Sequence, residues 1–536
     1  MKVFATFFSL LSTFGIAINA QQFSDTLWSN SYGGTNSEAA GFGNASFGSP
    51  SVSAVSDGGD IYLISYSSSD DLYVPSNNGP EDVYLLKLNA ETGDTIWTKS
   101  YGGTDTERAY DIIVHSDNHI YISGRSSSND NIFTGNNGNS DGFIMKIDKD
   151  GDVIWTELYG GTQPESFYGL VEAPNGNIVA VGETGSSDGD LSSVNVGTGL
   201  AWIIEIDSDN GDIVWQNVTP GVQDPTNAEY IENFWDVILL SDESGYVAVG
   251  SDGHFNDFNT DNIMVMKFDL SGDKVWEKGF GGPQRDWAAG VVEYDNNLFV
   301  AGNAGAQGGD VSDFYGLSDF WVLKLDMDGD LVEEKVFGGT DLEYPYGIEL
   351  DESNNTLILT GITRSDDNDL DGSTSYGGID AWAFVLNPTE LEIQSDYRWG
   401  GSDSDFAHQV VFNTNNSFPI IVGRTNSDDG YFSKDFNSTV LFATAFGEAS
   451  ANLHEFKALE ISVYPNPVND LLNISINGEL EKYDVKITDI QGRKIFEKDN
   501  MVDNLTILDF SEFQQGVYIL DVITNNRVFS KRFVKR

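Results

Sequence analysis

The chain has 536 residues and a formal net charge of −56, from 84 acidic and 28 basic residues. A protein this acidic repels nucleic acids and anionic membrane surfaces, so we exclude both as partners. Cysteine is absent, which excludes disulfides, thiolate zinc sites, iron–sulfur clusters and cysteine nucleophiles. The 57 glycines, with 40% hydrophobic and 12% aromatic residues, are typical of a folded β-rich protein with many turns.

Residues 1–20 are typical of a secretory signal peptide. Lys2 precedes an apolar stretch that ends in Ala17-Ile-Asn-Ala20, so we predict cleavage before Gln21. The alternative, a buried first helix, is disfavoured because the polar residues after position 20 interrupt the apolar run. No other segment has the ~18 apolar residues needed to span a bilayer. We therefore predict an exported protein that does not span the membrane.

An aromatic residue followed by Gly-Gly recurs along the chain. Six copies begin at Tyr32, Tyr101, Tyr159, Phe280, Phe337 and Trp399, and a degenerate copy lies at Pro220-Gly221. Successive copies are 57–69 residues apart. One interval contains four short β-rich runs separated by turns, at residues 107–114, 120–124, 143–147 and 153–159. Four strands per repeat are typical of a β-propeller blade.

The number of strands predicts a closed ring. Seven third strands are almost continuously apolar, as in Phe143–Ile147, which is expected of strands buried on both faces. The fourth strand Thr26–Tyr32 precedes any first strand, whereas the last repeat, residues 400–447, lacks a fourth strand. We therefore predict an all-β fold, a seven-bladed β-propeller closed by the N-terminal strand, which leaves no long exposed edge. The alternatives are a parallel β-helix or two stacked sandwiches.

The composition changes towards the C-terminus. Residues 21–456 carry a net charge of −56, whereas residues 457–536 carry −1. Short alternating apolar runs punctuated by Gly478, Gly492 and Gly516 predict a small β-sandwich after the linker. The predicted domains are a signal peptide (1–20), the propeller (21–447), a linker (448–459) and a C-terminal β-sandwich (460–536).

Four motifs follow one another in this tail: Val463-Tyr-Pro-Asn-Pro-Val468, Asp489-Ile-Gln-Gly-Arg493, Gly516-Val-Tyr-Ile-Leu520 and Lys531-Arg-Phe-Val-Lys-Arg536. In this order they resemble the type A C-terminal sorting domain of the type IX secretion system of Bacteroidota. The resemblance implies passage across the outer membrane, removal of the tail by a sortase-like peptidase, and attachment to surface lipopolysaccharide. The alternative is an ordinary ligand-binding sandwich. Residues 23–447 resemble the Tyr-Gly-Gly-Thr propeller repeats of exported bacterial proteins, which implies a fold rather than an activity.

One face of the predicted propeller collects carboxylates, because the Gly-Gly loops and the Ser/Asp-rich loops after the second strands lie on the same side. We expect a ring around a central channel from Glu38, Glu107, Glu165, Asp286, Glu343 and Asp405. Asp367, Asp369 and Asp371 form the best single run of calcium ligands, which makes Ca²⁺ the candidate cofactor. The run lacks the glutamate that closes an EF-hand loop, and the alternative is that Asp, Asn and Ser simply form turns. The Asp-x-Asp-Gly-Asp strings at 148–152 and 326–330 are predicted hairpin turns.

Signals for an enzyme are weak. The five histidines form no His-Glu-x-x-His motif, and Gly185–Gly189 matches a nucleophile elbow only by its letters, so no catalytic residue is assigned. We predict a monomer at the cell surface that binds extracellular glycan or protein without catalysis, with the secretion machinery and its sortase as partners. The alternatives are a polysaccharide hydrolase and a structural surface-layer component. Because an active site breaks repeat symmetry, we expect any site near residues 39–53 or 219–235.

Overall fold

The computed structural model describes most of the chain between residues 25 and 536. The described residues are 25–39, 51–193, 200–219, 232–252, 262–432, 438–447, 460–464, 468, 471–477, 483–489, 493–501, 505–511, 513–523 and 528–536. The predicted signal peptide, the predicted linker and most of the two segments expected to hold a site lie outside them. The chain divides into two compact units, residues 1–448 and 449–536.

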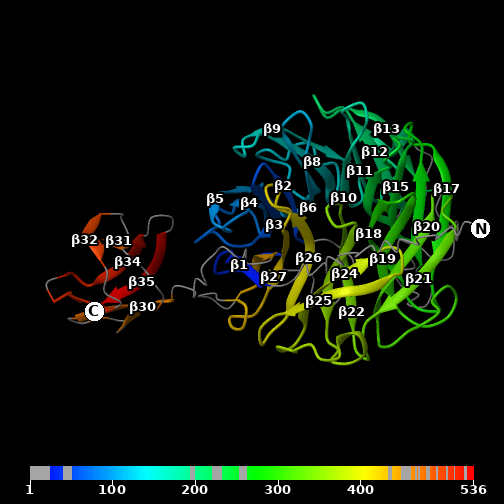
Figure 1. Cartoon of the computed structure of the whole chain (residues 1–536). Coiled ribbons are helices and arrows are strands. Elements are labelled where there is room, and N and C mark those ends of the chain that lie inside the picture. The colour runs from blue at the N-terminus through cyan, green and yellow to red at the C-terminus, as the bar shows by residue number, and fades with distance from the viewer. Residues whose placement is uncertain are drawn as a thin grey trace, which may run out of the picture. The chain divides into compact units, whose positions relative to one another are not determined.

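The described residues of the first unit form seven four-stranded antiparallel sheets, numbered here along the chain (Figure 1). Sheet 1 is β2 (Ser53–Asp57), β3 (Asp60–Ser67), β4 (Asp82–Asn89) and β5 (Thr95–Tyr101). Sheet 2 is β6 (Glu107–Val114), β7 (Ile120–Ser126), β8 (Asp141–Ile147) and β9 (Val153–Tyr159). Sheet 3 is β10 (Glu165–Glu172), β11 (Ile178–Thr184), β12 (Leu200–Ile206) and β13 (Ile213–Val218). Sheet 4 is β14 (Asn233–Leu239), β15 (Tyr246–Ser251), β16 (Ile263–Phe268) and β17 (Lys274–Phe280).

The remaining sheets follow the same order, and the last takes a strand from the N-terminus. Sheet 5 is β18 (Trp287–Tyr294), β19 (Asn297–Ala304), β20 (Asp319–Asp326) and β21 (Leu331–Phe337). Sheet 6 is β22 (Glu343–Asp351), β23 (Thr356–Thr363), β24 (Asp380–Asn387) and β25 (Glu392–Trp399). Sheet 7 is β26 (Asp405–Phe412), β27 (Pro419–Thr425), β28 (Val440–Gly447) and β1 (Asp25–Tyr32). Two short 3₁₀ helices, η1 (Gly189–Ser193) and η2 (Asn368–Leu370), lie in the loops that follow the second strands.

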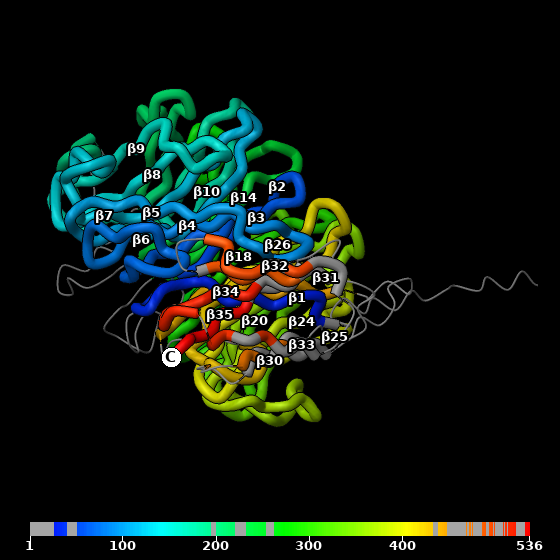
Figure 2. The backbone as a smooth tube through the Cα atoms, turned by 90° about the vertical axis from the view of Figure 1, so that its left-hand side faces the viewer, coloured from blue at the N-terminus to red at the C-terminus, as the bar shows by residue number. Residues whose placement is uncertain are grey.

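Burial follows the position of each strand in its sheet. The third strands β8, β12 and β28 are buried throughout, whereas the fourth strands β17 and β21 are largely exposed. The first strand of each sheet contacts the first strand of the next sheet, and β26 contacts β2 (Figure 1, Figure 2). The fold is therefore all-β and propeller-like, with the first strands innermost.

The N-terminal strand β1 pairs with β28 of the last repeat. The antiparallel register runs from Asp25 opposite Gly447 to Tyr32 opposite Leu441. The hydroxyls of Ser29 and Thr444 lie 2.8 Å apart across the pair. Residues more than 400 positions apart in the sequence therefore lie side by side, and β1 covers the edge of β28.

The three tyrosines among the repeated aromatic residues tie their sheets to a turn of the following sheet. The hydroxyls of Tyr32, Tyr101 and Tyr159 each donate a 2.7 Å hydrogen bond to a glycine carbonyl, that of Gly93, Gly151 and Gly211. These glycines have φ between 70° and 81°, and a β-carbon on Gly93 would lie 2.5 Å from the Trp28 ring. Trp28 therefore packs against a turn of the following sheet, and Trp97 and Trp215 pack in the same way at Gly151 and Gly272.

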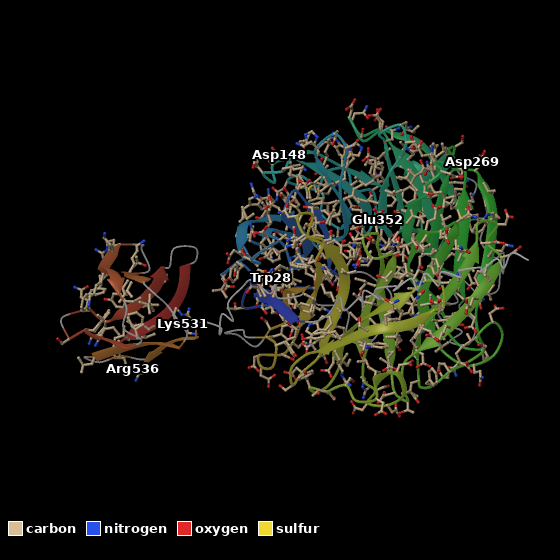
Figure 3. All side chains as sticks on the ribbon, in the orientation of Figure 1. Trp28, Asp148, Asp269, Glu352, Lys531 and Arg536 are labelled. Atoms are coloured by element: carbon tan, nitrogen blue, oxygen red, sulfur yellow. The ribbon has the colours of Figure 1, made fainter. Side chains whose placement is uncertain are left out.

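The Asp-x-Asp-Gly-Asp strings form hairpin turns, as predicted. Asp148 Oδ1 accepts hydrogen bonds from the backbone N–H groups of Asp150 and Asp152, both at 2.9 Å. Asp326 makes the equivalent bonds in sheet 5. Asp148 and Asp269 lie in such turns at the periphery of the first unit (Figure 3).

The second unit contains two sheets that share an apolar core. One sheet is β29 (Glu460–Tyr464), β30 (Leu471–Asn477) and β33 (Leu505–Asp509). The other is β32 (Lys494–Met501), β31 (Tyr483–Asp489), β34 (Gly516–Ile523) and β35 (Val528–Lys535). Their core includes Leu472, Ile487, Leu520 and Phe533, whereas Lys531 and Arg536 are exposed (Figure 3). Of the helices in the described parts of the chain, none has the length and apolar character that a membrane crossing requires.

Candidate functional site

The carboxylates expected to ring a channel are instead buried between sheets, where each clamps a Gly-Gly loop. Each accepts a hydrogen bond from the N–H of the second glycine, as Glu107 does from Gly103 at 2.7 Å and Glu343 from Gly339 at 2.8 Å. The six clamp acids are fully buried: Glu38, Glu107, Glu165, Asp286, Glu343 and Asp405. The sequence analysis identified these residues but placed them wrongly around a channel. The order of antiparallel strands predicts on which face of the fold a loop lies, but it does not predict whether the side chains of that loop are buried.

Burial dominates the electrostatics of the clamp acids. Desolvation raises the pKa of Glu38 to about 7, although Ser69, the Gly34 N–H and Ser67 donate hydrogen bonds that oppose the shift. Desolvation likewise raises the pKa of Asp405 to about 6, with a small contribution from the charge of Asp380. These carboxyls therefore carry less charge at neutral pH than the composition suggests.

The predicted calcium run is part of the same loop architecture. Asp367 accepts hydrogen bonds from the Thr340 backbone N–H and hydroxyl, both at 2.8 Å, and Asp71, Asp130 and Asp188 do the same in other repeats. Asp369 accepts a hydrogen bond from the Gly338 N–H at 3.0 Å, and Asp371 is exposed. Among the described residues, no three His, Asp or Glu side chains are grouped so that they could hold a metal ion. Calcium binding by Asp367, Asp369 and Asp371 remains a prediction.

Three positions next to each clamp acid break the repeat symmetry. The first position is the residue directly after the acid, and the second is the residue of the second strand that pairs with it, as Arg108 pairs with Arg125. The third position is three residues after the acid and lies in a β-bulge of the first strand. Many of the side chains there are aromatic or arginine, and Trp235 is the bulge residue of sheet 4. We call the following selection from these positions the aromatic–arginine circuit: Tyr66, Arg108, Tyr110, Arg125, Tyr168, Glu183, Trp235, Trp287, Tyr344, Tyr346, Phe406, His408 and Arg424.

Contacts within the circuit run from sheet to sheet. The Tyr168 ring lies 4.9 Å from Tyr110 of sheet 2 and 4.4 Å from Trp235 of sheet 4, measured between centroids. Arg108 lies 4.8 Å over the ring of Tyr66 in sheet 1, and Arg424 lies 4.2 Å over the ring of Phe406. Because these side chains extend from the innermost strands, they surround the centre of the sheet arrangement.

The circuit has a buried floor and a partly exposed upper layer. Tyr110 and Tyr168 are only 5% and 6% exposed, whereas Arg125, Trp235 and Arg424 are partly exposed. The Tyr168 hydroxyl donates to Glu183 Oε1 at 2.8 Å, which fixes the orientation of the ring. Burial, followed by the nearby charge of Arg424, lowers the pKa of His408 well below its usual value, so its imidazole is neutral. The circuit therefore presents aromatic surface together with the guanidinium groups of Arg125 and Arg424, whereas that of Arg108 is paired with Glu81 at 2.6 Å.

Sequence reasoning missed the circuit because it compared motifs and not individual positions. Aligning the repeats on the clamp acid and reading one and three residues further would have found it. Of the circuit residues, only Trp235 lies within the two segments, residues 39–53 and 219–235, in which we expected a site.

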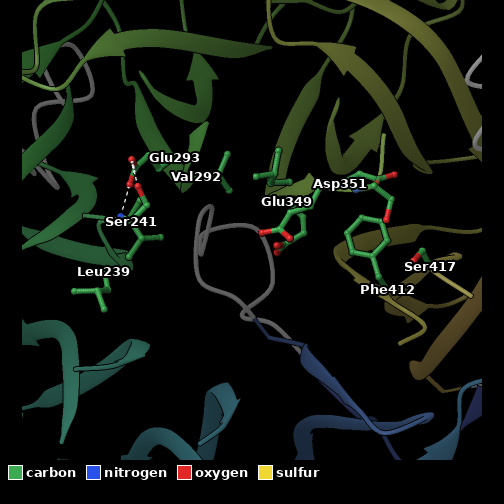
Figure 4. A pocket seen from close by; sticks show the side chains of 12 residues that line it. Leu239, Ser241, Val292, Glu293, Glu349, Asp351, Phe412 and Ser417 are labelled. Atoms are coloured by element: carbon green, nitrogen blue, oxygen red, sulfur yellow. Dashed lines mark hydrogen bonds between the residues drawn. The ribbon is translucent and has the colours of Figure 1, made fainter. Parts of the chain in front are cut away.

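A cavity of about 470 Å³ lies at the opposite ends of the first strands of sheets 4 to 7 (Figure 4). Of its acidic residues, Glu293 accepts hydrogen bonds from the Ser241 N–H and hydroxyl, and Asp351 accepts from the Ser353 N–H. Burial, followed by the charge of Asp236, raises the pKa of Glu349 to about 8. The carboxylates of Glu293 and Asp351 thus stabilise turns, and that of Glu349 is largely protonated at neutral pH.

Comparison with known proteins identifies the tail. Residues 462–536 match the family described as the secretion system C-terminal sorting domain, which confirms the resemblance of the four tail motifs. An endo-acting ulvan lyase of Formosa agariphila is 27% identical over 164 residues, which are 30% of this chain. The chain spans only 28% of the length of that relative.

Solved structures with a similar fold have low identity to this chain. Hydrazine synthase of Kuenenia stuttgartiensis is 12% identical, with 71% of this chain and 94% of that chain covered and a TM-score of 0.42. Quinohemoprotein alcohol dehydrogenase of Comamonas testosteroni is 11% identical, with 84% and 80% covered and a TM-score of 0.41. The endosialidase of phage phi92 is 9% identical, with 94% and 87% covered and a TM-score of 0.40. The sorting domain is the informative match, and it indicates secretion and attachment to the cell surface in Bacteroidota.

Proposed function

We propose that the exported protein is a seven-bladed β-propeller, closed by β1, that binds anionic polysaccharide at the cell surface without cleaving it. The proposed domains are the signal peptide (1–20), propeller (21–447), linker (448–459) and sorting domain (460–536). Support for closure comes from the pairing of β1 with β28 and from the contact of β26 with β2.

The aromatic–arginine circuit is the observation that carries the binding proposal. Aromatic rings stack on the apolar faces of sugars, and guanidinium groups form paired hydrogen bonds to carboxylates and sulfates. Arg108, Arg125 and Arg424 are three of only six arginines before residue 448. Half of the scarce arginine is therefore placed beside aromatic rings at the centre of the fold.

The net charge of −56 does not prevent binding of an anion at this place. At physiological ionic strength, charges separated by more than about 8 Å are largely screened. The binding surface therefore responds mainly to its own arginines, although association slows as the ionic strength falls and the repulsion extends further.

A polysaccharide-cleaving enzyme is the second candidate, and the 27% identity to an ulvan lyase favours it. The two candidates differ in their products. A lyase leaves unsaturated ends that absorb ultraviolet light, a hydrolase leaves reducing ends without that absorbance, and a binding protein leaves the polymer length unchanged.

Isothermal titration calorimetry of residues 21–536 against ulvan, a polyuronate and a neutral glucan tests the proposal. We expect binding of the two anionic polymers and at least tenfold weaker binding after Arg125→Gln or Trp235→Ala. Arg364→Gln is the matched control, because Arg364 is exposed and lies outside the circuit. Equal losses in the control, or equal binding of the neutral glucan, would refute the role of the circuit. Shortened polymer would favour the enzyme.

A further inference from the structure

Two junctions between sheets bring a pair of buried carboxylates to the first glycine of a Gly-Gly loop. At Gly338, Asp319 begins β20 of sheet 5 and Glu343 begins β22 of sheet 6. A β-carbon on Gly338 would lie 2.5 Å from Asp319 Oδ1 and 2.6 Å from Glu343 Oε2. The two oxygens are therefore at most 5.1 Å apart, and both side chains are fully buried.

The junction at Gly160, between sheets 2 and 3, repeats this arrangement. A β-carbon on Gly160 would lie 2.9 Å from Asp141 Oδ1 and 2.4 Å from Glu165 Oε2. Asp141 and Glu165 are fully buried as well. The same geometry thus occurs twice in one molecule.

In each pair, one oxygen is buried without a hydrogen-bond partner. These atoms are Asp141 Oδ1 and Asp319 Oδ1. The other oxygens are held in place, because Asp319 Oδ2 accepts from the Tyr315 N–H at 2.8 Å and Asp141 Oδ2 accepts from the Asn137 N–H at 2.9 Å. The free oxygen is therefore held facing the second carboxylate, an arrangement that is unfavourable without a positive partner.

A third carboxylate adds to the negative charge at both junctions. Asp369 accepts a hydrogen bond from the Gly338 N–H at 3.0 Å, and Asp190 accepts one from the Gly160 N–H at 2.9 Å. Burial, followed by the charges of Glu343 and Asp369, raises the pKa of Asp319 to about 7. Burial, followed by the charge of Asp190, raises the pKa of Asp141 to about 6. Lys335 contributes positive charge near Asp369.

The equivalent junction at Gly400 contains a cationic side chain. Arg398, which immediately precedes Trp399-Gly400, donates from Nε to Asp380 Oδ2 at 2.7 Å and is 6% exposed. Asp380 Oδ1 has no hydrogen bond there either, but its carboxylate is paired with the guanidinium. The residues equivalent to Arg398 at the other two junctions are Leu158 and Val336, which carry no charge.

At two further junctions, other features prevent an unpartnered carboxylate oxygen from facing a second acid. At Gly281, the neutral Asn262 occupies the place of the aspartate, and its Nδ2 donates to Asp252 Oδ2 at 2.9 Å, so only one of the two facing side chains is an acid. At Gly102, both oxygens of Asp82 accept backbone hydrogen bonds, from Asn78 and Gly79. Among the described junctions, only those at Gly160 and Gly338 combine two acids, an unpartnered oxygen on one of them, and an uncharged residue at the position of Arg398.

We propose that the junctions at Gly160 and Gly338 each bind a hard divalent cation, Ca²⁺ by preference, through the pairs Asp141–Glu165 and Asp319–Glu343. Calcium binds oxygen at 2.3–2.6 Å, so two oxygens on one ion lie no more than about 5.2 Å apart. The upper limits on the separation of the two oxygens, 5.1 Å at Gly338 and 5.3 Å at Gly160, permit such a distance. The ion takes the role that Arg398 fills at Gly400. It links the third strand of one sheet to the first strand of the next.

Terbium luminescence and calorimetric Ca²⁺ titration of residues 21–536, after removal of metal by a chelator, test this proposal. We expect Asp141→Asn and Asp319→Asn each to reduce the bound Ca²⁺ by one ion per chain, and the double variant to reduce it by two. Asp403→Asn is the control, because it removes the same charge from an exposed position outside both junctions and outside the predicted calcium run. Unchanged stoichiometry in both single variants would overturn the proposal.

A reciprocal exchange keeps the test valid if an aspartate variant fails to fold. Val336→Arg introduces, at the Gly338 junction, an arginine at the position that Arg398 occupies at the Gly400 junction. We expect this variant to bind one Ca²⁺ fewer per chain, and we expect its melting temperature to respond less to chelator. If the wild-type protein binds no Ca²⁺ or Tb³⁺ at pH 7.5, a proton holds the pair instead, and the proposal is wrong.

Discussion

Replacing Asp319 with asparagine should stabilise the cation-free protein at pH 8. The asparagine oxygen can still accept the hydrogen bonds from Tyr315 and Gly316, while its amide can donate to Glu343. At the Gly281 junction the chain already has a neutral asparagine, Asn262, in place of the aspartate, and its Nδ2 donates to Asp252. The substitution thus removes a buried charge and leaves the local hydrogen bonds in place.

The magnitude follows from the pKa of Asp319, which is raised from 3.8 to about 7, primarily by burial. Because the folded-state pKa is the higher one, the protonated group favours folding at low pH, and this stability is lost as the pH rises from about 4 through 7. At about 1.36 kcal/mol per pKa unit, full ionisation costs about 4 kcal/mol. An unfolding entropy of about 2.1 cal/mol/K per residue over roughly 420 residues converts this to about 4 °C in melting temperature.

Differential scanning calorimetry with chelator at pH 4, 6 and 8 measures the effect. We expect Asp319→Asn to melt about 4 °C above the wild type at pH 8 and within about 1 °C of it at pH 4. Asp371→Asn controls for the change in net charge, because its carboxylate is exposed. A difference that is the same at pH 4 and pH 8, or a variant that is less stable at pH 8, would refute the reasoning.

Three further outcomes follow from the fold. Gly338→Ala should destabilise the protein by about 2–4 kcal/mol in urea titration, because the β-carbon meets two carboxylates, whereas Gly279→Ala, with open space at that position, should be nearly neutral. Deleting residues 25–32 should lower the melting temperature and promote association in size-exclusion chromatography, because the edge of β28 becomes exposed. Deleting residues 460–536 should leave a folded protein that immunoblotting finds inside the cell envelope, and detection on the surface would contradict the sorting role.

The repeat pattern predicted the sheets well because six of the seven sheets of the first unit are built from consecutive strands. The spacing of the Gly-Gly pairs located the strands, and the leftover strand at residues 26–32 was correctly assigned to the sheet of the last repeat. The third strands were recognisable because burial on both faces requires an unbroken apolar run. These are local signals, and a single sequence contains them in full.

The site could not be predicted in the same way, because its contacts join different repeats. Asp319 and Glu343 lie 24 residues apart and meet only across two sheets. In a chain with 84 acidic residues, no local pattern separates a buried pair from solvated carboxylates. Burial of Glu343 and exposure of Asp371 became evident only in three dimensions, so the run with the most aspartates was favoured over the pair that converges.

The division between symmetric and asymmetric positions suggests how this scaffold separates stability from recognition. The clamp acid, the Gly-Gly pair and the hydroxyl residue that contacts them hold adjacent sheets together, so each repeat must keep them and none can specify a ligand. Positions one and three residues beyond the clamp acid also contact the neighbouring sheet, as Arg108 does with Tyr66, but different side chains make these contacts in different repeats. These positions can therefore differ, as Arg108 in sheet 2 and Trp287 in sheet 5 do. A clamp variant should therefore lower the melting temperature, whereas a variant of a partly exposed circuit residue, such as Arg125→Gln, should weaken ligand binding with a smaller change in melting temperature. Loss of both properties together in Arg125→Gln would mean that the circuit fills the centre of the fold and does not recognise a ligand.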